Sequence, residues 1–285
     1  MSIELKSLSY IYSPGTPFEK KALDNVSLTV SDGEYVGLIG HTGSGKSTLV
    51  QHLNGLLRPT SGSIIVQGID LTEKKPRYDE VRRKVGLVFQ YPEYQLFEET
   101  VAKDIAFGPK NLGLSEEEIA QRVSEAMELV GLSAEIGEKN PFELSGGQKR
   151  RAAIAGVLSM RPEVLVLDEP IAGLDPRGRD EILALIDNYH TKTGATIVLV
   201  SHNMDDIAHV AQRVIVMHEG KPVLDGTPQQ VFSNAERLQS LALDVPQAAL
   251  LVQELARRGM YLPKDCITIE QVFEAVMRQR KGELS

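Results

Sequence analysis

The sequence predicts an α/β fold built on a largely parallel sheet. The first observation is a set of short, nearly continuous apolar stretches, such as residues 164–167 and 196–200, which are typical of strands. The second is that helical patterns separate these stretches, so that strands and helices alternate along most of the chain. The third is the length of 285 residues, which is enough for one large domain with a small appendage.

Apolar periodicity and turn residues place the individual elements. We expect strands at 3–8, 26–30, 35–39, 64–67, 84–90, 164–167, 196–200 and 214–218. We expect helices at 48–54, 116–130, about 146–160, 177–193, 204–213, 248–258 and 269–280. The segment Ser13-Pro-Gly-Thr-Pro17 has the composition of a turn and is expected to form a loop.

Two segments depart from the alternation of strands and helices. Residues 101–143 are helical in pattern, so a helical insert is expected between two strand-rich halves. Beyond about Val231 the alternation stops and only two short helices are predicted. We therefore expect one domain at 1–230, with a helical subdomain at about 101–160, and a C-terminal extension at 231–285.

Charge and hydropathy limit the classes of function. The chain has 31 Lys and Arg against 39 Asp and Glu, a formal net charge of −8, which argues against a nucleic-acid partner. No apolar run approaches the roughly 20 residues of a membrane-spanning helix, and the sequence begins without the apolar stretch of a signal peptide. We expect a cytoplasmic protein, and any membrane process that it serves must take its membrane part from other subunits.

The clearest motif is Gly40-His-Thr-Gly-Ser-Gly-Lys-Ser47, which lies between a predicted strand and a predicted helix. Glycines in such a loop let backbone N–H groups surround a phosphate, and the helix N-terminus adds its positive dipole end. The Lys46 ammonium is expected to reach the β- and γ-phosphates, and the Ser47 hydroxyl to ligate Mg²⁺. The expected nucleotide contacts here are Gly40, His41, Thr42, Gly43, Ser44, Gly45, Lys46, Ser47 and Thr48.

A second motif is the apolar stretch Val164-Leu-Val-Leu, which ends in the carboxylates of Asp168 and Glu169. At the carboxyl end of a parallel strand these side chains would face the ligand crevice. Asp168 is then placed to hold Mg²⁺, and Glu169 to orient or deprotonate an attacking water. Alone, this pattern could equally mark a strand that leaves the core for solvent.

A second Gly-rich turn, Leu144-Ser-Gly-Gly-Gln148, precedes a predicted helix. Ser145 is a typical N-cap residue, although two glycines in a loop could also serve only a positive φ. With the phosphate loop and the paired carboxylates, this segment resembles the signature of the nucleotide-binding subunits of ATP-binding cassette (ABC) transporters. The resemblance covers about residues 1–230. It implies a P-loop NTPase core with a mixed sheet, an antiparallel β subdomain and a helical insert, followed by a small helical C-terminal domain.

The resemblance also implies roles for single residues. Tyr12 stands where the family stacks an aromatic ring on adenine, and Gln90 where a glutamine senses Mg²⁺ and water. Asp175 ends a loop, beginning at Ala172, that communicates across the dimer in this family. His202 resembles the switch histidine that contacts the γ-phosphate.

A head-to-tail dimer is implied as well. In such a dimer Ser145, Gly146, Gly147 and Gln148 would bind the ATP that sits on the partner's phosphate loop. Glu169, His202 and Gln90 would be the catalytic residues, and Ser47, Gln90 and Asp168 the Mg²⁺ ligands.

Two further segments resemble one branch of the family. The loop 12–22 and the C-terminal residues 243–246 and 268–271 resemble the second ATPase of energy-coupling factor (ECF) transporters, which import vitamins. The implied partners are a second ATPase, usually a paralogue, a membrane scaffold subunit and a substrate-binding membrane subunit, with this chain peripheral on the cytoplasmic face. The tail would be a dimerisation extension or, alternatively, a generic helical cap.

The segment after Gln90 is where the family docks the scaffold subunit. We expect Glu93, Glu98 and Glu99 to meet basic residues there, with a solvated acidic loop as the alternative. The alternative functions are the ATPase of a cobalt or nickel importer and a soluble ABC ATPase of DNA repair or translation, although the single cassette with its short insert argues against the latter. Glu169 and His202 argue against a regulatory module that only binds ATP.

Overall fold

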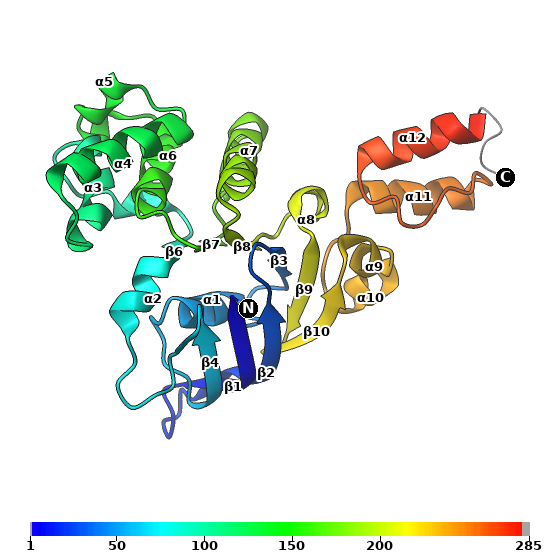
Figure 1. The fold of residues 1–285 in the computed structure, drawn as a ribbon. Helices are drawn as coiled ribbons and strands as arrows, with labels where there is room; N and C mark the ends of the chain where they lie inside the picture. The colour runs from blue at the N-terminus through cyan, green and yellow to red at the C-terminus, as the bar shows by residue number, and fades with distance from the viewer. Residues whose placement is uncertain (1, 281–285) are drawn as a thin grey trace.

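Two sheets organise the computed structural model, which describes residues 2–280 (Figure 1). The larger sheet has six strands in the order β10-β9-β3-β8-β7-β6. Five of them run parallel, and β10 is antiparallel to its neighbour β9, so the sheet is mixed. The strands are β3 (Tyr35–Ile39), β6 (Val85–Val88), β7 (Val164–Asp168), β8 (Thr196–Val200), β9 (Arg213–His218) and β10 (Lys221–Gly226).

The smaller sheet is antiparallel and has four strands in the order β2-β1-β4-β5. They are β1 (Ile3–Tyr12), β2 (Lys20–Val30), β4 (Ser61–Val66) and β5 (Ile69–Asp70). Their inward side chains pack with those of the larger sheet in one cluster that includes Ile3, Leu5 and Val36. The implied antiparallel β layer is therefore present beside the mixed sheet.

A group of helices stands to one side of the sheets, at the upper left of Figure 1. It comprises α3 (Val101–Asn111), α4 (Glu116–Leu129), α5 (Ala134–Gly137) and α6 (Gly146–Leu158), with the short 3₁₀ turns η1 (Pro92–Gln95) and η2 (Pro141–Glu143). Thr100 and Ser115 cap α3 and α4 by accepting hydrogen bonds from the third residue of each helix. Sequence periodicity alone had not resolved α3.

The remaining helices before β10 connect strands: two of them link the larger sheet to the smaller one, and two connect strands of the larger sheet. They are α1 (Lys46–Leu53), α2 (Tyr78–Lys84), α7 (Pro176–Thr193) and α8 (Met204–Val210). Helix α1 starts two residues before the predicted boundary, and α2 was not predicted. The predicted helix 204–213 is too long, because the chain becomes extended at Ala211 and Arg213 already belongs to β9.

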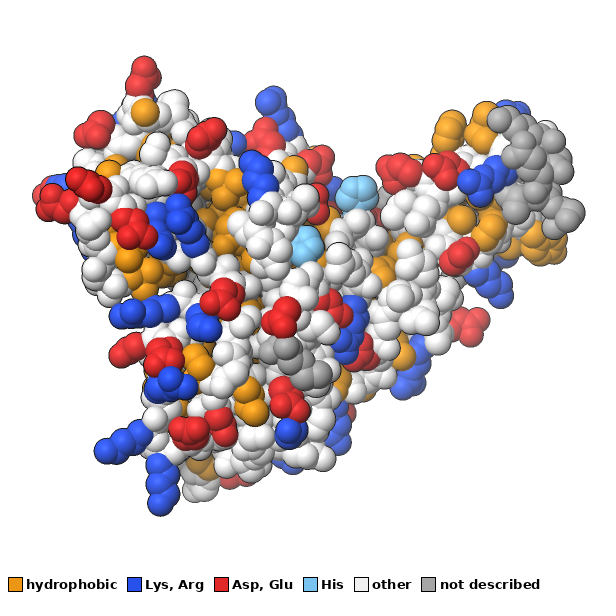
Figure 2. All heavy atoms as spheres, viewed as in Figure 1, with side chains coloured by type: hydrophobic (Ala, Val, Ile, Leu, Met, Phe, Trp, Pro, Cys, Tyr) orange, Lys and Arg blue, Asp and Glu red, His pale blue; other side chains and the backbone are white. Residues whose placement is uncertain are grey.

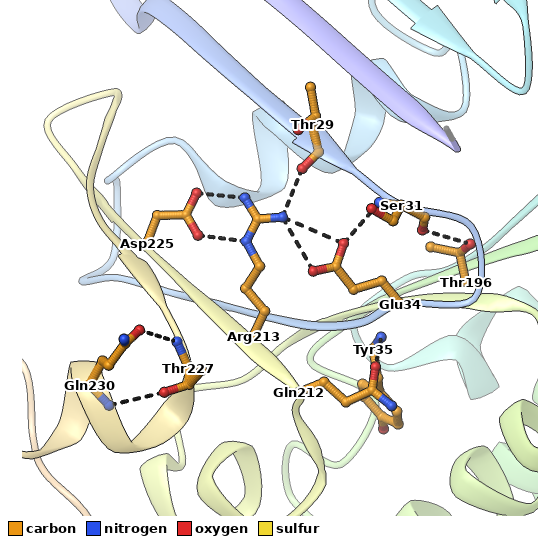
Figure 3. A network of polar contacts seen from close by, with 10 residues as sticks. All are labelled: Thr29, Ser31, Glu34, Tyr35, Thr196, Gln212, Arg213, Asp225, Thr227 and Gln230. Atoms are coloured by element: carbon orange, nitrogen blue, oxygen red, sulfur yellow. Dashed lines mark hydrogen bonds and ion pairs between the residues drawn. The ribbon is translucent and has the colours of Figure 1, made fainter.

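Long-range contacts of Gln212 and Arg213 explain why that helix stops (Figure 3). Gln212 Oε1 accepts a hydrogen bond from Tyr35 N at 3.2 Å, and Gln212 N donates to Tyr35 O at 2.8 Å, which aligns this segment beside β3. The Arg213 guanidinium forms two 2.6 Å contacts with Asp225 and a 3.2 Å contact with Glu34. These partners hold β9 between β3 and β10.

The C-terminal part packs in two different places. Helices α9 (Pro228–Phe232) and α10 (Ala235–Ser240) follow β10, and Phe232 and Leu238 are fully buried in the main core. Helices α11 (Gln247–Arg257) and α12 (Ile269–Arg280) form a separate hairpin with its own small core, which includes Ala248 and Val252. In Figure 1 this hairpin extends from the body as an arm on the right.

Within residues 2–280, no helix is long and apolar enough to cross a membrane.

Candidate nucleotide site

The parallel strands bring the predicted site residues to one edge of the larger sheet. Gly40 follows the last residue of β3, and Asp168 is the last residue of β7. Gln90 and His202 each come two residues after the end of a strand, β6 and β8 respectively. Because these strands are parallel, their carboxyl ends meet at the same edge, which is where ligands bind in such sheets.

The phosphate loop depends on glycine at two positions. Gly40 has φ 155°, and a Cβ there would lie 2.3 Å from the main-chain oxygen of Met217 at the end of β9. Gly45 has φ 105°, and its Cβ would lie 2.6 Å from the oxygen of Ala22. The loop is therefore wedged between β2 and β9 in a conformation that other residues rarely adopt.

Lys46 begins α1 and lies back over the loop. Its Nζ donates to the main-chain oxygens of Gly40 at 2.6 Å and His41 at 3.2 Å. Burial lowers the pKa of this ammonium, and the nearby carboxylates of Glu169 and Asp168 oppose that shift. The side chain thus holds the loop closed and keeps a positive charge beside two carboxylates.

Glu169 is the centre of a polar cluster at this edge. Its Oε1 lies 2.6 Å from Nε2 of His202, and its Oε2 accepts a 2.9 Å hydrogen bond from Nε2 of Gln90. Glu169 also has φ 53°, a left-handed conformation that is uncommon for a non-glycine residue and marks stored strain. Residues that follow three strands, β6, β7 and β8, therefore converge on one carboxylate, a set of contacts that the sequence did not predict.

Asp168 lies on the inner side of this cluster. Burial raises the pKa of its carboxyl, while a hydrogen bond from the Ser47 side chain acts in the opposite direction. Ser47 is the second residue of α1, so the carboxylate at the end of β7 is joined directly to the phosphate loop. The hydroxyl, the carboxylate and the Gln90 amide are the hard oxygen donors that Mg²⁺ prefers.

The remaining nucleotide-loop predictions lie close by. The Tyr12 hydroxyl, at the end of β1, is 3.1 Å from Thr48 Oγ1, so this ring lies beside the start of α1. Nδ1 of His41 contacts Thr42 O at 2.8 Å, and the His41 ring packs on His218 with 5.0 Å between centroids. Ser44 is buried, and its hydroxyl has no hydrogen-bond partner within the described part of the chain.

The signature segment and Asp175 are placed differently. Ser145 caps α6 in a reciprocal capping box with Gln148, while Gly146 and Gly147 have open space on their Cβ side. Asp175 caps α7 by accepting a 2.9 Å hydrogen bond from Gly178 N. In Figure 1, α6 lies in the helical group, well apart from α1, so the signature is not gathered around the chain's own phosphate loop.

Two of the three acidic residues expected to meet basic residues of a partner, Glu93 and Glu99, already have partners within this chain. Glu93 forms a two-pronged ion pair with the buried Arg150, so it is already neutralised within the chain. Glu99 pairs with Lys103 on the surface at 2.6 Å. The sequence predicts no role for Arg150, which is the middle residue of the basic run 149–151 that follows the signature.

Comparisons with known proteins agree with this geometry. The sequence profile described as ABC transporter matches residues 23–172. Among curated relatives, the "Energy-coupling factor transporter ATP-binding protein EcfA2" of Caldanaerobacter subterraneus subsp. tengcongensis is 57 % identical over 282 residues, 99 % of each chain. The protein of the same name from Clostridium tetani is 58 % identical over 279 residues, covering 98 % of this chain and 97 % of the relative.

Solved structures point the same way. The cbiO1 protein of Clostridium perfringens, described as part of the ABC transporter complex cbiONQ, matches with a TM-score of 0.73 and 37 % identity over 90 % of this chain and 98 % of its own. The ATP-binding cassette MJ0796, solved as a dimer in a post-hydrolysis state with ADP and Pi, matches with a TM-score of 0.71 and 28 % identity over 79 % and 98 % of the two chains.

Fold and site together define an ATP-binding cassette ATPase, an enzyme that binds and hydrolyses ATP. Sequence identity above 50 % to the two curated relatives, over nearly the full length, then shows which family of these ATPases the chain belongs to. The chain belongs to the family of energy-coupling factor transporter ATP-binding proteins.

Proposed function

We propose that this chain is one of two ATPase subunits that drive uptake of a vitamin or similar micronutrient across a membrane. It sits on the cytoplasmic face, under a membrane scaffold subunit and a separate substrate-binding membrane subunit. The observation that carries the proposal is the Glu169 carboxylate, held between Gln90 and His202 at the strand ends beside the phosphate loop. The near full-length similarity to proteins named as ECF transporter ATPases supports the choice of transporter.

ATP is bound with its phosphates on the loop 40–47 and its adenine against Tyr12. Lys46, which holds the carbonyls of Gly40 and His41, exchanges these contacts for the β- and γ-phosphates. Ser47, Asp168 and Gln90 would hold Mg²⁺, which when bound neutralises charge on the phosphates.

Glu169 orients the attacking water and accepts its proton, since its carboxylate is the acceptor group at the strand edge. His202 positions that carboxylate at 2.6 Å and supports the γ-phosphate. Gln90 connects the site to the segment that follows it, because its amide donates to the same carboxylate. The positive φ of Glu169 stores strain that aims the side chain toward these two neighbours.

The complete site requires two chains. Ser145, Gly146, Gly147 and Gln148 bind the ATP held by the partner's phosphate loop, and Asp175 lies at the same junction. The open Cβ side of both glycines supports this role, because backbone N–H groups at a helix start can approach a phosphate there. The dimeric form in which the MJ0796 cassette was solved supports a site shared by two chains.

The C-terminal hairpin provides a further dimer contact. Tyr261 and Phe273 expose 75 % and 65 % of their surfaces, and Leu250, Leu251, Ile269 and Met277 are also exposed. Figure 2 shows hydrophobic side chains gathered over this arm. Apolar surface of this kind on a projecting arm is typical of an interface. We keep the boundary between cassette and extension near residue 230 and assign dimerisation within 231–285 to the hairpin of α11 and α12, because Phe232 and Leu238 pack in the main core.

The scaffold subunit docks beside the segment that follows Gln90. A groove of about 890 Å³ lies between η1, α2, α3 and α6, and Phe97 and Phe107 pack edge to face at its rim. Phe97 and Tyr94 expose 59 % and 84 % of their surfaces. Glu98 is the carboxylate best placed to meet a basic residue, since Glu93 and Glu99 have partners within the chain.

The proposal is tested by measuring steady-state ATP turnover of Glu169→Gln in the assembled complex. Loss of the general base should lower kcat by about 10²-fold or more while nucleotide binding persists. Glu163→Gln is the matched control, because Glu163 lies just before the opposite end of β7 and its side chain forms an exposed 3.6 Å ion pair with Lys84. Turnover of Glu169→Gln equal to that control would refute the assignment.

A further inference from the structure

Arg150, in the second turn of α6, is a buried arginine that contacts two other segments of the chain. Its Nε lies 2.9 Å from Oε2 of Glu93, and its Nη2 lies 2.6 Å from Oε1. Its Nη1 donates to the main-chain oxygens of Pro170 at 3.2 Å and Ala172 at 2.7 Å. Only 2 % of the side chain is exposed, and the guanidinium carbon lies 5.8 Å from the ring centre of Tyr91.

This arrangement requires arginine and its carboxylate partner together. The planar guanidinium provides two parallel N–H groups for one carboxylate and a third group for the two carbonyls, which an ammonium cannot do. A charge buried this deeply is tolerated only when it is paired and hydrogen-bonded. Removing either Arg150 or Glu93 would therefore leave an uncompensated charge inside the protein.

Each segment that meets at Arg150 adjoins a residue of the nucleotide site. Glu93 lies in η1, three residues after Gln90, whose amide donates to Glu169. Pro170 follows Glu169 directly, and Ala172 begins the loop that leads to Asp175. Helix α6 itself starts at the signature segment. Glu93, Pro170 and Ala172 are 57, 20 and 22 residues from Arg150 in sequence, so only the tertiary fold brings them together on this helix.

We propose that Arg150 is a positioning residue that ties the segment after Gln90, the signature helix and the loop between Glu169 and Asp175 into one unit. A displacement of the docking segment then reaches the signature and the Glu169 loop together. This inference rests on the proposed function, because it assumes that those residues act on ATP in a two-chain site. Arg150 acts through these neighbours, and the phosphate loop lies outside its contacts.

The test compares Arg150→Gln, Glu93→Gln and the double variant in the assembled complex, by steady-state ATP turnover. We expect kcat to fall about tenfold to a hundredfold in Arg150→Gln, because small misplacements of reacting groups are costly. The KM for ATP should stay within about twofold, since binding to the phosphate loop is untouched. The double variant should lose no more than the worse single variant, because the pair acts as a unit.

The double variant contains no unpaired buried charge, so it tests the proposal even if a single variant does not fold. Arg122→Gln is the matched control. Arg122 is likewise paired: its Nε and Nη2 donate to one oxygen of Glu118, Oε1, at 3.1 and 2.7 Å, and its Nη1 donates to Met160 O at 3.3 Å. These partners lie within α4 and after α6, away from the nucleotide-site segments. The kcat of Arg122→Gln should stay within about twofold of wild type.

Three results would overturn the inference: turnover of Arg150→Gln equal to that of Arg122→Gln, losses that multiply in the double variant, or a raised KM with unchanged kcat. Glu169→Gln, measured in the same complex, separates the two proposals. Normal turnover of Glu169→Gln would mean that the proposed function fails. An inactive Glu169→Gln beside a fully active Arg150→Gln would mean that only the inference about Arg150 fails.

Discussion

Asp206 is a carboxylate whose replacement should make the protein more stable. It lies on α8, four residues after His202, and its side chain is 5 % exposed. Oδ1 lies 3.4 Å from Nε of Arg179 on α7, and Oδ2 has no hydrogen-bond partner within residues 2–280. Burial raises the pKa of Asp206 to about 6, with Arg179 acting against the shift. The perturbation is Asp206→Asn, which keeps the shape and removes the charge.

The expected gain follows from this pKa. A rise from 3.8 to about 6 is a little over two units, and each unit corresponds to about 1.4 kcal/mol between the two protonation states. The ionised carboxylate therefore costs the folded state about 3 kcal/mol relative to the unfolded chain. Asp206→Asn should raise the free energy of unfolding by a similar amount, about 2 to 3 kcal/mol, at pH 7.5.

The sign of the pH dependence is unusual for an aspartate. Because the folded pKa lies above the unfolded one, the folded state binds more protons between about pH 4 and pH 6, and stability falls as the pH rises through this window. Below pH 4 both states are protonated and the cost disappears. The difference between variant and wild type should therefore shrink to about 0.5 kcal/mol at pH 4.

Urea unfolding of both proteins at pH 4, 5.5 and 7.5 measures this difference. Asp187→Asn is the control, because Asp187 is an exposed aspartate on α7, and its effect should stay within about 0.5 kcal/mol at every pH. A pH-independent gain would show that charge burial is not the cause. A loss of stability at pH 7.5 would show that the Arg179 pair outweighs the desolvation cost, and would refute the reasoning.

Three further predictions test the packing and the nucleotide loop, two of them with a paired control substitution. Gly40→Ala should lower the free energy of unfolding by about 2 to 6 kcal/mol and abolish ATP binding, because its Cβ would overlap the oxygen of Met217; Gly43→Ala, with nothing within 4 Å, should cost less, about 1 to 3 kcal/mol. Equal losses in urea unfolding would contradict this. Phe232→Ala should destabilise the cassette by about 3 to 5 kcal/mol, because its ring is buried in the main core. Calorimetry measures this loss, and a calorimetric trace in which only the C-terminal hairpin is destabilised would contradict the prediction. Tyr12→Ala should weaken ATP binding by about 1 to 3 kcal/mol and Tyr12→Phe much less, as read by nucleotide titration; equal effects of the two would rule out ring stacking.

The phosphate loop shows how much a short motif can predict. The strand 35–39, the glycines and the helix after them are neighbours in sequence, so their spacing specifies a local conformation that the structure contains. The predicted strand 196–200 and the predicted helix 269–280 are likewise confirmed to the residue, because the strong hydrophobic pattern of each segment favours a single type of secondary structure. Boundaries were least certain where tertiary contacts decide them, as at Arg213.

The contacts that organise the site were beyond the reach of sequence patterns. That Gln90 and His202 converge on Glu169 follows from the order β8-β7-β6, which periodicity does not reveal. Glu93 illustrates the same limit. It was assigned to a partner's basic residues, yet an arginine 57 positions later neutralises it inside the chain.

The sequence by itself determined the class of protein, the phosphate loop, the paired carboxylates and the signature segment, because these depend on residue type and short spacing. The tertiary structure alone decided which side chains meet. It placed Arg150 where three segments join, packed Phe232 and Leu238 into the main core, and left the hairpin of α11 and α12 with a small core of its own. The physical reason is that burial and ion pairing act between surfaces brought together by the whole chain, whereas glycine conformations, helix caps and strand periodicity act between neighbours.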